Sequence, residues 1–104
     1  MIVEERVYTL VPGGVPEYLR LYQEFGMEIQ KPILGHMVGY FHTEIGTLNQ
    51  IVHMWAYDSL DERTRRRAEL GADPGWQDYV KKIRPLILSQ ESKILIPAPF
   101  SPNP

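Results

Sequence analysis

Apolar and polar residues alternate along residues 2–11, IVEERVYTLV, and this period of two predicts a β-strand. The run PGG at 12–14 ends the strand. Over residues 15–31 the apolar residues recur at three-and-four spacing, which predicts an amphipathic helix. Pro16 suits the first turn of that helix, where its missing N–H is not needed, and Pro32 is expected near its end.

Two further strand-like runs, residues 34–44 and 49–57, flank the turn sequence IGTL at 45–48, in which Gly46 suits a hairpin. Pairing the two ends of this turn fixes a register in which residues opposite each other share a face of the sheet. The register predicts three cross-strand pairs: Tyr40 with His53, Val38 with Trp55, and His36 with Tyr57.

The second half of the chain repeats the helix-then-strand order. The capping box SLDE at 59–62 predicts a helix start, and ADPGW at 72–76 interrupts that helix and restarts it. The run SKILIPAPF at 92–100 predicts the last strand. We expect one domain over residues 1–98 and a proline-rich tail over residues 99–104.

The predicted order βαββαβ is that of the α+β ferredoxin-like plait, an antiparallel sheet with both helices on one face. Right-handed crossovers place the first strand beside the third, in the centre of the sheet. The opposite face is predicted to be too apolar to contact water, so we expect a homodimer to cover it. That face carries Val3, Val7, Thr9, Met37, Phe41, Val52, Met54 and Ala56.

The composition narrows the classes of function. The chain has 104 residues, enough for one domain, and 11 basic against 13 acidic residues give a formal charge of −2, which offers no general attraction for nucleic acid. It has no cysteine, which excludes disulfides and thiol chemistry. No apolar run is long enough for a signal peptide or a membrane span, so we expect a cytoplasmic protein.

Three blocks of sequence resemble the NIPSNAP family: EERVYTLVPG at 4–13, GYFHTEIGTLNQIVHMWAYDSLDER at 39–63, and DPGW at 73–76. They match the family's E-x-R-x-Y opening strand, G-x-F-x-T-E-x-G-x-L-N hairpin, H-x-W-x-Y strand and D-P-x-W motif, in order and over nearly the whole chain. The resemblance implies a ferredoxin-like subunit that dimerises into an α/β barrel. The superfamily it implies includes cofactor-independent monooxygenases and haem-binding chlorite dismutases.

The resemblance does not extend every function of the family to this chain. Animal members of the family are mitochondrial proteins involved in vesicle handling and mitophagy signalling. This chain begins without an arginine-rich presequence, so we do not expect that role here. For small bacterial-type members the resemblance implies a fold and no established activity.

The predicted pairing gathers chemically versatile side chains on one face of the two central strands. The candidate catalytic residues are Arg6, which suits a carboxylate or phenolate, and His53, which suits proton exchange near neutral pH. The candidate ligand-binding residues around them are Glu4, Tyr8, Tyr40, Trp55 and Tyr57, whose aromatic rings suit a flat substrate. The alternative is structural: a buried Glu4–Arg6 ion pair inside an aromatic core.

Two further clusters were considered. Arg63 and Arg67 lie one helical turn apart and suit an anionic ligand, with pairing to nearby acids on a solvated face as the alternative. His36, His42 and His53 share a face in the predicted register, but His36 lies too far along the sheet to complete a metal site. We therefore expect no metal and no cofactor.

These observations predict a dimeric NIPSNAP-like protein that binds a small organic molecule, aromatic or carboxylate-bearing. Two hypotheses stay open. In the first, the protein is a cofactor-independent oxygenase in which Arg6 holds a substrate anion and His53 takes its proton. In the second, it is a non-catalytic dimeric binding or interaction module.

Overall fold

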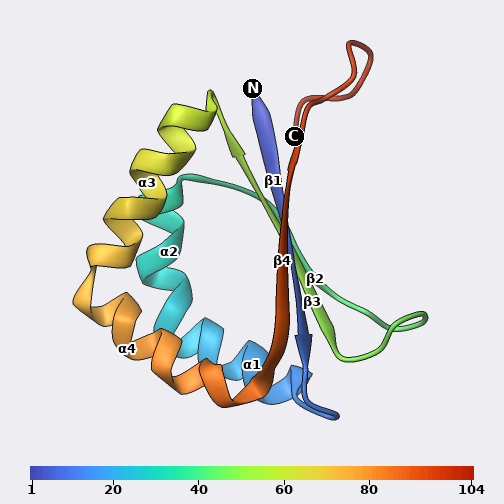
Figure 1. Cartoon of the computed structure of the whole chain (residues 1–104), viewed down its shortest axis with the longest axis vertical. Coiled ribbons are helices and arrows are strands. Elements are labelled where there is room, and N and C mark those ends of the chain that lie inside the picture. Colours follow the sequence, from blue (N-terminus) through green and yellow to red (C-terminus); the bar gives the residue numbers. More distant parts are fainter.

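A computed structural model describes all 104 residues as one sheet with a layer of helices on one of its faces (Figure 1). The order βαββαβ is as predicted, with each helical segment divided in two. The elements are β1 (Ile2–Leu10), α1 (Val15–Leu21), the π-helical turn η1 (Tyr22–Gly26), α2 (Met27–Leu34), β2 (His36–His42), β3 (Gln50–Tyr57), α3 (Leu60–Ala72), α4 (Pro74–Ile83), the 3-10 turn η2 (Arg84–Leu86) and β4 (Ile87–Leu95).

The sheet is antiparallel with the strand order β2-β3-β1-β4, so the ferredoxin-like fold and the central β1–β3 pair are confirmed. Glu4 lies opposite Trp55, and Arg6 lies opposite His53. Because side chains alternate along a strand, these four residues share one face, and it is the face that the helices cover. These four candidate residues therefore lie inside the folded domain.

The predicted register of the hairpin holds at its loop end and fails further along β2. Tyr40 pairs with His53 as predicted, but the register shifts between Met37 and Gly39. Met37 rather than Val38 then lies opposite Trp55, and His36 pairs with Ala56 rather than with Tyr57. A bulge adds one unpaired residue, so the side chains on its far side from the hairpin loop, those of His36 and Met37, lie on the other face from the one predicted. Met37 thus packs against the helices, and its predicted place on the opposite face was wrong.

The first helical segment is longer than predicted and contains a π turn. It runs through Pro32 to Leu34 and ends at Gly35, whose φ of 91° favours glycine. Gly26, the last residue of η1, lies against the ring of Tyr79, and a Cβ there would meet that ring at 2.9 Å. The glycine allows α4 to approach the first helical segment closely.

The boundaries of the second half combine confirmed and corrected predictions. The Ser59 hydroxyl accepts a hydrogen bond from the Glu62 backbone N–H, which confirms the cap of α3, and Asp73 caps α4 through the N–H of Trp76. The predicted last strand was wrong in extent, because β4 begins at Ile87 and ends at Leu95. Its early start completes the wall of the cavity described below.

The buried residues form two clusters between the sheet and the helices. The larger includes four tyrosines and aliphatic residues under α1, η1 and α4; the smaller surrounds Trp55. The other face of the sheet has no helix over it (Figure 1). No helix combines the length and the apolar character that crossing a membrane requires.

Candidate functional site

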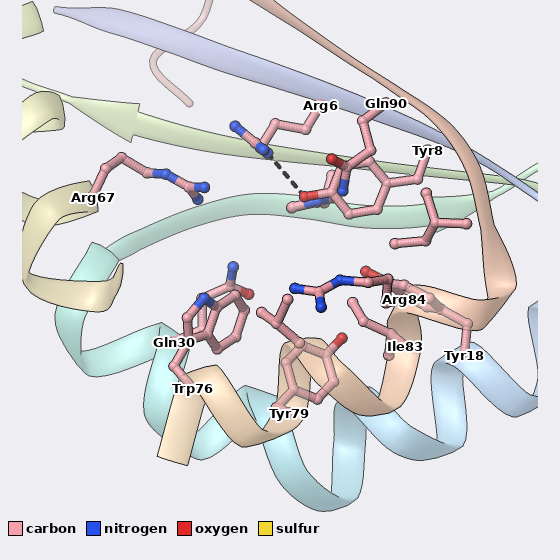
Figure 2. A pocket seen from close by; sticks show the side chains of 13 residues that line it. Arg6, Tyr8, Tyr18, Gln30, Arg67, Trp76, Tyr79, Ile83, Arg84 and Gln90 are labelled. Atoms are coloured by element: carbon pink, nitrogen blue, oxygen red, sulfur yellow. Dashed lines mark hydrogen bonds between the residues drawn. The ribbon is translucent and has the colours of Figure 1, made fainter. Parts of the chain in front are cut away.

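A cavity of about 340 Å³ lies between the helix-covered face of the sheet and α1, α2 and α4 (Figure 2). Its volume is within the range usual for small-molecule sites. The residues that line it are Arg6, Tyr8, Tyr18, Gln30, His53, Arg67, Trp76, Tyr79, Val80, Ile83, Arg84, Ile87 and Gln90.

Four of the nine predicted site residues line this cavity. They are Arg6 and Tyr8 from β1, His53 from β3 and Arg67 from α3. The other five lie behind the wall or away from it: Glu4, Tyr40, Trp55, Tyr57 and Arg63. Glu4, Tyr40 and Trp55 contact lining residues directly. Arg63 contacts Glu4.

Glu4 is the buried anchor of the basic side chains. Its carboxylate accepts hydrogen bonds from Arg6 (3.0 Å), from two nitrogens of Arg63 (2.8 and 3.2 Å) and from the Ser92 hydroxyl (2.6 Å). Burial alone would raise the pKa of Glu4, but these hydrogen bonds and the two cations outweigh it and lower the pKa to about 2. The expected Glu4–Arg6 ion pair therefore exists, and Arg63 completes it.

His53 is held in one protonation state. The indole N–H of Trp55 donates to Nδ1 of His53 at 2.8 Å, so this nitrogen must accept and the neutral ring carries its proton on Nε2. Burial, with the charges of Arg6 and Arg67, lowers the pKa of His53 to about 3. The ring is therefore uncharged at neutral pH. Its Nε2 is buried and has no hydrogen-bond partner in the protein.

Aromatic rings fix the position of His53 on the sheet. Tyr40 stacks on the imidazole with ring centroids 4.6 Å apart, and Tyr22 stacks on the other face of Tyr40 at 4.4 Å. The hydroxyls of Tyr40 and Tyr18 share a hydrogen bond of 2.8 Å. Tyr8 meets the imidazole edge-on at 5.0 Å. These contacts leave the ring little freedom to rotate.

Arg67 and Arg84 bring positive charge to the cavity without an acidic partner. Neither forms a salt bridge, whereas Arg63 binds Glu4. Burial and the nearby Arg6 lower the pKa of Arg67 from its ordinary value. Arg84 comes from η2 at the end of α4, and its side chain reaches into the middle of the cavity in Figure 2.

Sequence reasoning missed the helical wall of the cavity. The restart of the helix at 72–76 was predicted, but no role in a site was given to the apolar side chains that follow it, which are Trp76, Tyr79, Val80 and Ile83. Gln30 was overlooked, although it follows the buried Tyr22 and Gly26 at a spacing of four, on a stripe where a polar residue is unusual. A buried polar residue on an apolar stripe was the available signal.

The three histidines do not gather at one point. His53 is 1% exposed, whereas His36 and His42 are exposed at opposite ends of β2. No group of three or more His, Asp or Glu side chains is arranged to hold a metal ion. The cavity is instead a site whose polar atoms are mostly hydrogen-bond donors.

The fold and the geometry thus define a ferredoxin-like domain with a basic cavity beneath its sheet. The sequence model of the NIPSNAP family matches residues 3–102, and the chain belongs to this family. It is 36% identical to Protein NipSnap homolog 1 of Danio rerio over 101 residues and 35% identical to Protein NipSnap homolog of Dictyostelium discoideum over 94 residues. The matches cover 97% and 90% of this chain, but only 36% and 41% of those relatives.

Solved structures show the same fold. A NIPSNAP family protein with unknown function from Agrobacterium tumefaciens is 53% identical, with a TM-score of 0.96 over 98% of this chain and 92% of that one. An uncharacterized NIPSNAP-like domain protein from Burkholderia xenovorans is 50% identical, with a TM-score of 0.96 over 98% and 89%. An antibiotic biosynthesis monooxygenase is 12% identical, with a TM-score of 0.65 over 95% of this chain and all of that one, which shows a shared fold alone.

Proposed function

We propose that this protein binds a small organic anion, aromatic or carboxylate-bearing, in the cavity beneath its sheet. The observation that carries the proposal is the charge of the lining. Three arginines line the cavity and no aspartate or glutamate does. Arg67 is half-buried and has no acidic partner, so an anionic ligand that supplies the missing charge binds with a gain in free energy.

Arg67 is the residue on which we base the anion site. Glu4 already pairs with two arginines, so it has no capacity left for Arg67. The guanidinium is planar and offers a fork of N–H donors that matches the two oxygens of a carboxylate. In Figure 2 the Arg67 side chain extends from α3 toward Arg6 across the sheet side of the cavity.

The remaining lining suits a flat apolar body. Trp76, Tyr79, Val80 and Ile83 form the wall on the α4 side, and the rings of Trp76 and Tyr79 lie with centroids 4.9 Å apart. At about 30 Å³ for each water-sized group, 340 Å³ has room for roughly eleven non-hydrogen atoms. A monocyclic aromatic acid is of this size.

The geometry supports binding rather than proton transfer to His53. Oxygenation with His53 as the base requires a ring nitrogen that is free to accept a proton. Nδ1 already accepts from Trp55, and Nε2 carries the proton. We therefore propose that His53 donates a hydrogen bond to the ligand, and that the protein works as a binding module.

Isothermal titration calorimetry with benzoate tests the anion site. We expect wild-type protein to bind benzoate and Arg67→Met to bind it about 10- to 100-fold more weakly, the worth of a charge-assisted hydrogen bond. The matched control is Arg65→Met, because Arg65 lies on the same helix, is exposed and reaches only Glu62, at 3.7 Å. Equal loss in both variants, or no binding by the wild type, contradicts the proposal.

We also propose that two copies of the chain pair through the uncovered sheet face. Support comes from its apolar side chains: Phe41 is 55% exposed and Leu95 39% exposed, beside Val3 and Met54. Such a patch on a protein surface is typical of an interface. The conspicuous aromatic residues of β3 lie on the other face, so they are not part of this contact.

Light scattering after size exclusion tests the homodimer. We expect a dimer for the wild type and a monomer for Phe41→Asp, which puts a charge into the contact. Phe25→Asp is the control, since Phe25 is 38% exposed on the helical side. A dimer that survives Phe41→Asp contradicts pairing through this face.

A further inference from the structure

Two side chains in the wall of the cavity are each held from behind by a residue that does not line it. His53 and Gln30 are 1% and 2% exposed, and both line the cavity. Trp55 donates to Nδ1 of His53 at 2.8 Å, and the Tyr22 hydroxyl donates to Oε1 of Gln30 at 2.6 Å. The two contacts are alike in position and in direction.

Each contact uses the accepting atom of the side chain that it holds, so only the donating group of that side chain remains for a ligand. A neutral imidazole and a carboxamide each contain one group that donates and one that accepts. Trp55 occupies the accepting nitrogen of His53, so the ring of this lining residue carries its proton on Nε2, which is buried and has no hydrogen-bond partner in the protein. Tyr22 occupies the oxygen of Gln30, which leaves its NH₂ group, and Figure 2 shows this nitrogen directed toward Arg67.

The neighbouring lining side chains also offer hydrogen-bond donors and no acceptors. Arg67 and Arg6 only donate hydrogen bonds, because guanidinium has no acceptor. Together with His53 and Gln30 they form a donor-only end of the cavity. A carboxylate only accepts hydrogen bonds, so none of its oxygens would face another acceptor at this end. An uncharged carboxamide of the same shape would turn its own NH₂ toward a donor and leave it unpaired, which costs binding energy.

We propose that Trp55 and Tyr22 are positioning residues that set the hydrogen-bond polarity of this cavity, so that it selects a carboxylate over the matching carboxamide. The inference rests on the proposed function and narrows its ligand class. It gives Trp55, a residue of the family motif, a role beyond packing. A phenylalanine would pack in much the same place but could not donate a hydrogen bond to the imidazole.

The test compares benzoate with benzamide by isothermal titration calorimetry. Wild-type protein is expected to bind benzoate at least about tenfold more tightly. In Tyr22→Phe the amide of Gln30 is free to turn over, and the ratio of the two affinities is expected to fall about tenfold. The control is Gln23→Met, an exposed residue of the same helical turn, which keeps the wild-type ratio.

Trp55→Phe provides the second variant, with a spectroscopic readout. Nitrogen-15 NMR of wild-type protein is expected to show His53 as the Nε2–H tautomer, whereas Trp55→Phe shows a mixture of tautomers and a lower affinity ratio. A purely structural role would lower stability in either variant and leave both the ratio and the tautomer unchanged.

The outcomes separate this inference from the proposed function. If the wild type binds benzoate but both variants keep the wild-type ratio, the inference is overturned and anion binding stands. A charged or Nδ1-protonated His53 in the wild type also overturns the inference alone. If the wild type binds no benzoate, the proposed function is wrong and the inference falls with it.

Discussion

The buried, neutral His53 makes the stability of the fold depend on pH in a defined window. Its folded-state pKa is about 3, below the ordinary value of 6.5, because of burial and the charges of Arg6 and Arg67. As the pH falls below 6.5, the unfolded chain binds a proton that the folded chain does not, so the unfolded state gains stability. The loss approaches about 1.4 kcal/mol for each pH unit well below pH 6.5. It sums to about 2.3 kcal/mol between pH 6.5 and 4.5, because the unfolded histidine is only half protonated at pH 6.5.

The variant His53→Gln isolates this contribution. A glutamine oxygen can still accept from Trp55 and its NH₂ can still donate, but the side chain does not titrate. Urea unfolding followed by circular dichroism gives the free energy of unfolding at each pH. The free energy of unfolding of the wild type minus that of the variant should fall by about 2.3 kcal/mol from pH 6.5 to 4.5.

The control for this prediction is His42→Gln, at the exposed end of β2, which should follow the wild-type pH dependence. If the wild-type and His53→Gln stabilities stay parallel across the window, the histidine is charged in the folded protein and the reasoning is refuted. The same result would remove the physical basis for a neutral donor in the cavity.

Two more predictions concern the supports of the cavity. Glu4→Gln leaves the two arginines that it binds without their carboxylate, and we expect a loss of about 3–5 kcal/mol in urea unfolding; an unchanged stability would show that the ion pairs contribute nothing. Gly26→Ala places a methyl group 2.9 Å from the ring of Tyr79 and should cost about 1–3 kcal/mol. The matched Gly71→Ala, with open space around it, should instead gain about 0.5–1 kcal/mol, and equal thermal shifts in the two alanine variants would contradict the close approach.

The order of the elements was predictable because local physics fixes it. Alternation identified β1 and β3, and the cap at Ser59 and the restart at Asp73 are properties of a few adjacent residues. The central pairing of β1 with β3 then followed from the handedness of the crossovers. This was sufficient to place Arg6 opposite His53.

The rest depended on tertiary packing. The bulge beside Val38 reverses the faces of His36 and Met37, and nothing in the local pattern shows which residue stays unpaired. Arg63 and Arg67 were expected to act alike, since they lie one turn apart; only the position of Glu4 under α3 separates a paired arginine from an unpaired one. The role of Gln30 could not be predicted because it depends on its hydrogen bond with the Tyr22 hydroxyl, which only the tertiary structure reveals.

The central claim is that the cavity beneath the sheet is an anion site. A crystal structure of the wild-type protein with benzoate tests it most directly, because it locates the ligand. We expect density in the cavity with the carboxylate against Arg67 and the Nε2 of His53, and the ring against Trp76. Benzoate bound elsewhere, or bound with its carboxylate turned away from Arg67, would contradict the account.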